Sequence, residues 1–210
     1  MITNLMLFFL LSSSIQSEIP NQEPNKCKYV NLSNKYIYEI ISLKKREDDR
    51  TLFTDVYINI INKKNSKVIQ TIHRSGDEVR MLYEDTFNNT SSSRSYITGY
   101  NKSKMINNGD FGDIIILDFN FDGKEDLAIK KDVGREFYYD FYIQKSEKEY
   151  ILDKFLSNEN LGRFPRIDFG KKKMTYAGMM GAGRWWQSEY IYNQKTNKWS
   201  LIKTKIEVIR

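Results

Sequence analysis

Short stretches in which apolar and polar residues alternate follow one another along most of the chain, and turn-forming residues separate them. Residues 36–43 and 53–61 show this alternation, which is typical of half-buried β-strands. A polar turn at 62–66 leads into a further extended stretch at 67–73. The pattern therefore predicts a β-hairpin built from 53–61 and 67–73.

The second half of the chain continues in the same way. Further strands are expected at 114–117, 127–129, 137–143, 150–152, 166–169, 173–177, 185–192 and 198–208. Residues 88–94 contain no apolar side chain and predict an exposed loop, whereas 95–100 predicts another strand. Residues 153–162 are expected to form a short helix or an irregular crossover.

This series of short strands predicts an all-β fold of antiparallel hairpins, arranged as a sandwich-like or degenerate propeller-like domain. No clean internal repeat is present, which disfavours a regular multi-blade propeller. No linker rich in proline or glycine divides the chain. We therefore expect a polar N-terminal segment at 18–35 and a single β domain at 36–210.

The first seventeen residues carry no charge and contain a short apolar run at 5–11. This run is too short to span a bilayer, and the small residue Ser17 marks a plausible cleavage site. These features predict a signal peptide at 1–17 and a periplasmic or secreted protein. A buried N-terminal strand is the alternative.

Composition argues against several other kinds of site. Cys27 is the one cysteine, so an internal disulfide cannot form, and the one histidine, His73, argues against a zinc site. The net charge is +6, but the basic residues are interspersed with acids. Because no block of five or more like charges is present, nucleic-acid binding is disfavoured.

The most specific chemistry lies in residues 118–126, which read Asp-Phe-Asn-Phe-Asp-Gly-Lys-Glu-Asp. Short side chains that carry oxygen occupy alternate positions and then the last one, and Gly123 permits a sharp turn. Lys124 is expected to turn its backbone carbonyl inward and to leave its own charge in solvent. This spacing wraps oxygen ligands around a hard cation and predicts calcium. The expected ligands are Asp118, Asn120, Asp122, Lys124 and Asp126.

The loop departs from an EF-hand in two respects. Ile129 stands where an EF-hand has its bidentate glutamate, and the flanks at 114–117 and 127–129 read as strands rather than helices. The prediction is therefore a strand, a calcium loop and a second strand. The alternative is a turn between two strands that binds no metal.

Residues 177–186 combine glycines, two methionines, an arginine and two tryptophans. Trp, Tyr and Arg dominate the energetic centres of protein interfaces. We expect a partner-binding surface formed by Arg184, Trp185, Trp186 and Tyr190. Internal packing of both tryptophans is the alternative.

No catalytic constellation is readable, because no nucleophile-elbow sequence accompanies the single histidine and no phosphate-binding glycine loop is present. We therefore expect a protein that is not an enzyme.

Several segments in the second half, taken together and in order, resemble a known family. They are 118–129, 140–143, 171–175, 188–192 and 197–202. The family consists of exported bacterial calcium-loop β proteins, which are integrin-like or degenerate β-propeller relatives. It includes a periplasmic immunity protein that inhibits a lysozyme-like effector of a bacteria-killing secretion system. The resemblance spans roughly residues 110 to 205.

The resemblance implies calcium at the 118–126 loop and a protein partner, a lysozyme-like peptidoglycan hydrolase that the chain inhibits. Two other functions stay open. One is a β module that binds carbohydrate or the cell surface, and the other, less favoured, is a cell-wall hydrolase.

Overall fold

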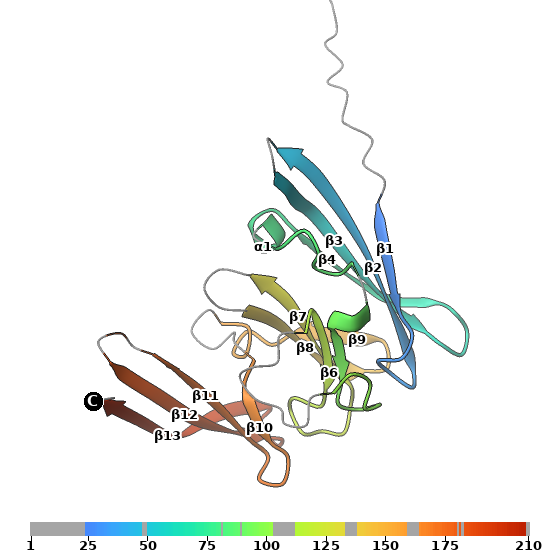
Figure 1. Ribbon diagram of the computed structural model, residues 1–210. Coiled ribbons are helices and arrows are strands. Elements are labelled where there is room, and N and C mark those ends of the chain that lie inside the picture. Colours follow the sequence, from blue (N-terminus) through green and yellow to red (C-terminus); the bar gives the residue numbers. More distant parts are fainter. Residues whose placement is uncertain are drawn as a thin grey trace, which may run out of the picture.

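The computed structural model is built almost entirely of strands that form three sheets (Figure 1). It describes residues 24–47, 50–80, 82–88, 90–102, 112–132, 138–158, 164–179, 181 and 183–208. The signal peptide predicted at 1–17 lies outside these residues. The three sheets are called here the N-terminal, the central and the C-terminal sheet.

The N-terminal sheet is an antiparallel array in the order β1-β2-β3-β4. Its strands are β1 (Asn25–Tyr29), β2 (Tyr36–Glu47), β3 (Arg50–Asn62) and β4 (Val68–Ser75). The strands predicted at 36–43 and 53–61 and the hairpin with 67–73 are confirmed, and β2 and β3 extend several residues further.

Part of the segment at 18–35, predicted to be polar and to precede the β domain, joins this sheet as β1. The strand reads Asn-Lys-Cys-Lys-Tyr, in which exposed polar residues mask the pattern, yet Tyr29 and Leu32 are fully buried. Backbone pairing with β2 and the burial of these two side chains hold the segment in place.

The central sheet has the order β5-β6-β7-β8-β9. Its strands are β5 (Ser93–Ser95), β6 (Ile114–Leu117), β7 (Asp126–Asp132), β8 (Tyr138–Ser146) and β9 (Glu149–Leu152). The chain reaches it through α1 (Asp77–Arg80) and η1 (Thr90–Ser92). All pairs are antiparallel except β5 with β6, which is parallel.

Two predictions before β6 are wrong. The exposed loop predicted at 88–94 ends early, because 90–92 form η1 and 93–95 form β5, and the strand predicted at 95–100 gives way to a turn after Ser95. Ser93 and Ser95 are fully buried. Their small side chains allow the strand to run beside β6 without an apolar residue, so hydrophobic patterning cannot detect it.

The C-terminal sheet is an antiparallel meander in the order β10-β11-β12-β13. Its strands are β10 (Arg166–Asp168), β11 (Lys173–Met179), β12 (Arg184–Asn193) and β13 (Lys198–Val208). The four strands predicted at 166–169, 173–177, 185–192 and 198–208 are confirmed, with bounds that differ by at most two residues. Residues 153–158 are irregular, as expected for the crossover that precedes this sheet.

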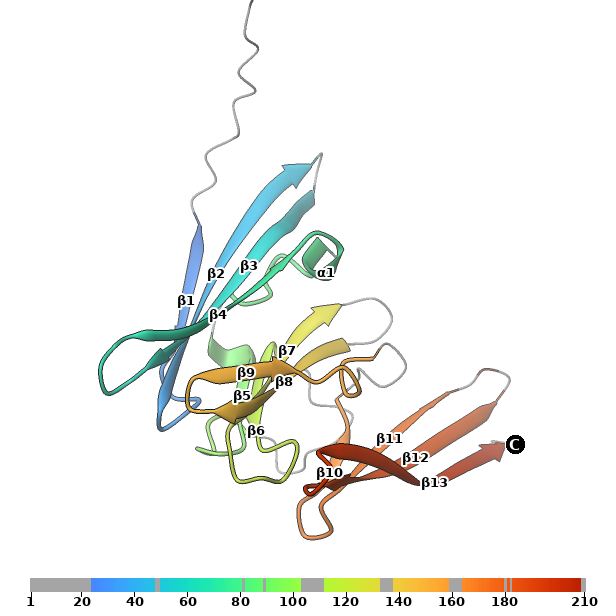
Figure 2. The same cartoon turned by 180° about the vertical axis from the view of Figure 1, so that it is seen from behind.

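The three sheets stack so that the central sheet is covered on both faces (Figures 1 and 2). Strand β6 explains this arrangement, because its four consecutive apolar residues are all fully buried. Ile114 and Ile116 pack with the N-terminal sheet, whereas Ile115 and Leu117 pack in a second cluster with the C-terminal sheet. A strand buried on both faces reads as a continuous apolar run. The predicted all-β, sandwich-like fold is confirmed.

A buried arginine links the N-terminal and central sheets. Arg74 of β4 is 1% exposed, and its guanidinium donates hydrogen bonds to the carbonyl oxygens of Lys130 (2.7 Å) and Glu78 (3.0 Å). It also forms an ion pair with Asp140 of β8 at 3.2 Å. Replacing one partner of such a network leaves the other buried groups uncompensated.

We therefore expect Arg74→Met to lower the free energy of unfolding by about 3 kcal/mol. Urea denaturation of both proteins measures this difference. Lys28→Met serves as the control, because Lys28 pairs with Glu39 at the surface, and such pairs contribute about 0–1 kcal/mol. Equal losses in the two variants would contradict a structural role for Arg74.

Candidate metal-binding loop and partner surface

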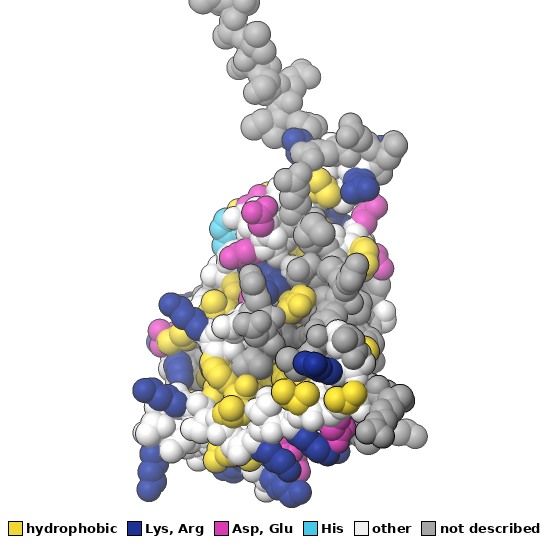
Figure 3. Space-filling model, turned by 90° about the vertical axis from the view of Figure 1, so that its left-hand side faces the viewer, with side chains coloured by type: hydrophobic (Ala, Val, Ile, Leu, Met, Phe, Trp, Pro, Cys, Tyr) yellow, Lys and Arg dark blue, Asp and Glu magenta, His cyan; other side chains and the backbone are white. Residues whose placement is uncertain are grey.

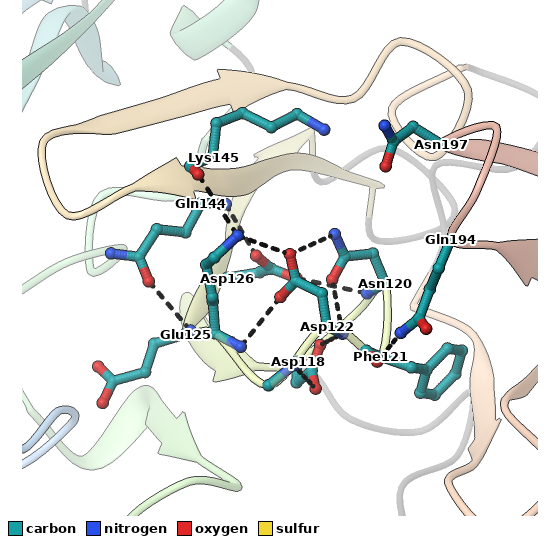
Figure 4. Close-up of polar contacts among 12 residues, drawn as sticks. Asp118, Asn120, Phe121, Asp122, Glu125, Asp126, Gln144, Lys145, Gln194 and Asn197 are labelled. Atoms are coloured by element: carbon teal, nitrogen blue, oxygen red, sulfur yellow. Dashed lines mark hydrogen bonds and ion pairs between the residues drawn. The ribbon is translucent and has the colours of Figure 1, made fainter.

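The 118–126 loop joins β6 to β7 and lies beside the C-terminal sheet (Figure 4). Two phenylalanines anchor it. Phe119 is fully buried and packs edge-on against Phe141 and Phe164, with ring centroids 5.0 and 5.9 Å away. Phe121 packs in the same way against Trp199 of β13 at 6.3 Å. Aromatic and oxygen-bearing residues alternate along the loop, so the two phenylalanine rings pack into the core while the polar side chains between them remain available to the turn.

The backbone of the loop enters the left-handed region twice. Gly123 has a φ of 84°, which a glycine adopts without cost, and Phe121 has a φ of 60°. The sharp turn predicted at Gly123 is confirmed. The value at Phe121 is costly for a residue with a side chain. The burial of its ring and its backbone contacts hold it there.

The carboxylate of Asp126 closes the loop from within. Its Oδ2 accepts hydrogen bonds from the backbone N–H groups of Phe119 (2.8 Å) and Asn120 (3.4 Å). Its Oδ1 accepts the N–H of Gln144 on β8 at 2.8 Å. Asp126 is fully buried. One side chain therefore fixes the first residues of the loop to two strands of the central sheet.

The other polar side chains fold over the turn. The carboxylate of Asp118 accepts hydrogen bonds from the backbone N–H groups of Asp122 (2.9 Å) and Gly123 (2.8 Å). The side-chain amide of Asn120 donates to Asp122 at 3.1 Å. The side chain of Lys124 is 43% exposed, and its ammonium forms an ion pair with Asp122 at 3.1 Å and donates to a backbone carbonyl of β8. Its charge therefore lies at the surface of the loop, where it offsets one of the carboxylates.

Burial raises the pKa of Asp126 well above the usual range of an aspartate, and the charges of Asp118 and Asp122 raise it further. The N–H groups of Gln144 and Phe119 oppose this shift. The pKa of Asp118 is also raised, first by burial. Four carboxylates, those of Asp118, Asp122, Glu125 and Asp126, thus share the described loop with a single ammonium group, that of Lys124.

The donor set fits calcium in its chemistry, since it consists of carboxylate and amide oxygens. The geometry is not that of a preformed cage. The described residues contain no group of three or more His, Cys, Asp or Glu side chains placed to hold a metal ion. The carboxylate oxygens instead accept the backbone N–H groups of the loop, so an ion would compete with these hydrogen bonds.

Three residues that hold the loop carry no motif and were not predicted. Gln144 accepts the N–H of Glu125 at 3.2 Å and donates to the hydroxyl of Tyr36 in the N-terminal sheet at 2.8 Å. Ser33 donates to the Glu125 carboxylate. Gln194, in the turn between β12 and β13, donates to the backbone carbonyl of Phe121 (Figure 4). The loop therefore touches all three sheets.

The four residues of the predicted partner surface do not all face the same way. Trp186 and Tyr190 pack against the second core cluster, and the Tyr190 ring lies 5.2 Å from that of Phe155. Arg184 is exposed at the start of β12. Trp185 is half-buried on the opposite face of the strand from Trp186, as alternation requires. The arrangement leaves Arg184 and Trp185 accessible to a partner.

No helix among the described residues has the length and apolar character needed to cross a membrane.

Comparison with known proteins finds a likeness in fold. No family model matches the chain, and no curated protein matches its sequence. A solved structure, described as a Xanthomonas type IV secretion system related protein, superposes with a TM-score of 0.53 at 15% identity. The match covers 90% of this chain and 96% of that one. The chain is thus an all-β protein that shares its overall fold with that structure.

The raised pKa of Asp126 gives stability a pH dependence of known sign. A carboxyl whose pKa is higher in the folded state binds its proton more readily there, so its contribution to stability grows as pH falls toward the unfolded pKa of about 3.9. We expect this gain between about pH 7 and about pH 5 in the presence of a chelator, and we expect it to be smaller in Asp126→Asn. Urea denaturation at both pH values tests this, and identical pH slopes for the two proteins would contradict it.

Proposed function

We propose that the chain is an exported calcium-binding protein that acts by binding another protein, and that this partner is a lysozyme-like peptidoglycan hydrolase that it inhibits. The observation that carries the proposal is the 118–126 loop, where oxygen ligands in calcium-loop spacing lie at the junction of the three sheets. The chain itself is not proposed to be an enzyme.

Charge supports the calcium part of the proposal. The charge of Asp122 raises the pKa of Asp118, the charges of both raise the pKa of Asp126, and Lys124 pairs with Asp122 alone. A divalent cation relieves this repulsion, and hard oxygen donors are its preferred ligands. Asp118, Asn120, Asp122 and Asp126 would supply side-chain oxygens, and Lys124 its backbone carbonyl.

The C-terminal sheet supports the protein-binding part. The β11–β12 hairpin projects from the body of the molecule (Figures 1 and 2). Met179 near its tip is 61% exposed, and Arg184 and Trp185 lie on the returning strand. An aromatic ring, a methionine and an arginine at an exposed tip are typical of the energetic centre of an interface. The fold shared with a secretion-system related protein is consistent with this role.

A cavity favours carbohydrate binding as a second candidate function. It has a volume of about 390 Å³ and opens on the outer face of the C-terminal sheet. Its lining includes Arg166, Asp168, Gln187 and Glu189, and Phe169 lies beside them. Planar polar groups beside an aromatic ring can hydrogen-bond and stack on a sugar. This arrangement favours a β module that binds cell-wall glycan.

We expect calcium to bind the folded protein and raise its thermal midpoint, because an ion that binds only the folded state stabilises it. Asp122→Ala removes a ligand and a charge, so we expect it to lower the calcium affinity about tenfold or more, as measured by isothermal titration calorimetry. The matched control is Asp168→Ala, which removes another carboxylate that accepts a backbone N–H in a turn. Wild-type affinity in Asp122→Ala would show that this loop is not the calcium site.

For the partner surface, we expect Trp185→Ala to weaken binding to a purified lysozyme-like muramidase about tenfold, as truncation of an interface aromatic commonly does. Tyr83→Ala is the control, because Tyr83 is an aromatic residue that is 57% exposed and lies outside the C-terminal sheet. Surface plasmon resonance measures both affinities, and turnover of a cell-wall substrate reports inhibition.

Three results would redirect this proposal. Equal affinities for Trp185→Ala and the wild type would place the interface elsewhere. Retention on purified peptidoglycan without any effect on the muramidase would favour the glycan-binding function. Cleavage of peptidoglycan by the purified protein would contradict a non-enzymatic role.

A further inference from the structure

The C-terminal sheet ends in a long strand with a free edge. Strand β13 has 11 residues and is the last in the order β10-β11-β12-β13. Among the described residues it pairs with β12 alone. A long edge strand presents a row of N–H and C=O groups that can pair with another strand.

This strand also exposes apolar side chains. Leu201, Ile202, Ile206 and Val208 are 56%, 50%, 57% and 67% exposed. Figure 3 looks toward the end of the C-terminal sheet and shows apolar side chains in a row, with basic side chains below them. An edge strand with this much exposed apolar surface normally has a covering partner.

The two faces of β13 differ in character. Ile206 lies opposite Trp186 and Thr204 opposite Ser188, so both belong to the inner face. Lys203, Lys205 and Glu207 alternate with them and belong to the outer face, where Lys205 and Glu207 form an exposed ion pair. The charges that commonly protect an edge strand therefore cover the outer face only.

The order of the charges favours a second copy of β13 as the occupant. When two copies of one strand pair antiparallel about a two-fold axis, the residue at the axis lies opposite its own copy. Residues at equal distances on either side of it then lie opposite each other, on the same face of the sheet. An axis at Thr204 places Lys203 against Lys205 of the second copy. An axis at Lys205 or at Glu207 places that charge against itself. A register shift at 201–203 breaks the alternation of faces in β13, so the axis must lie beyond it. Among residues 203–207, only an axis at Ile206 avoids like-charge pairs within 204–208, and it places Lys205 against Glu207 twice.

We propose that two copies of this chain associate by antiparallel pairing of β13 with β13 about Ile206, which joins their C-terminal sheets into one continuous sheet. On the inner face, Ile206 meets Ile206 and Thr204 meets Val208. On the outer face, two Lys205–Glu207 pairs fix the register. The inference is independent of calcium and of the proposed hydrolase partner.

Charge-reversal variants at positions 205 and 207, made in the full-length chain, test the register of the strand pairing. Lys205→Glu places glutamate against Glu207 of the second copy twice, and Glu207→Lys places lysine against Lys205 twice. Each single variant should therefore dimerise about tenfold more weakly than the wild type in analytical ultracentrifugation. The double variant Lys205→Glu with Glu207→Lys restores both pairs and should dimerise like the wild type.

A mixing experiment separates pairing from any effect on folding. In an equal mixture, the carboxylates of the Lys205→Glu variant lie opposite the ammonium groups of the Glu207→Lys variant at both pairs, so the mixture should form a heterodimer at wild-type strength. Circular dichroism checks that each variant is folded. A wild-type protein that stays monomeric up to about 100 μM would overturn the proposal. Single variants that dimerise fully, or a mixture that does not associate, would overturn it as well.

Discussion

The structure depends on one buried carboxylate. Asp126 accepts backbone N–H groups from the start of the 118–126 loop and from β8, and it does so from a fully buried position. Burying a charge is costly unless hydrogen bonds compensate it, so the loop and the strand must both be in place for this residue to be accommodated. The apolar core supplies most of the burial, but this carboxylate fixes where the first residues of the loop meet the sheet.

The same loop connects the three sheets. Gln144 and Glu125 connect it to Tyr36 and Ser33 beside the N-terminal sheet. On the other side, Phe121 connects it to Gln194 and Trp199 of the C-terminal sheet. An ion held by the loop oxygens would therefore act on the position of the C-terminal sheet, which carries the proposed partner surface, the polar cavity and the free edge of β13. Ion binding in the loop and the position of the proposed binding surfaces are thereby coupled through direct contacts.

Much of this organisation could be predicted from the sequence, because alternation and turn residues identify hairpins directly. The strands of the C-terminal sheet and the sharp turn at Gly123 are examples. Strand β5 could not be predicted, since its buried serines carry no apolar signal. The roles of Gln144 and Gln194 were also inaccessible, because both depend on contacts between segments far apart in the chain. The side chain of Lys124 is 43% exposed, but its ion pair with Asp122 could not be read from the spacing alone.

Amide hydrogen exchange with and without calcium tests the central claim most directly. If the loop binds the ion and joins the sheets, calcium should change exchange at 118–126, at Gln144 and in the turn that contains Gln194. The paired ends of β2 and β3 at 44–46 and 51–53, at the end of the N-terminal sheet away from Tyr36, should exchange at the same rate in both conditions. Unchanged exchange across the loop, or a change confined to another part of the chain, would contradict the account.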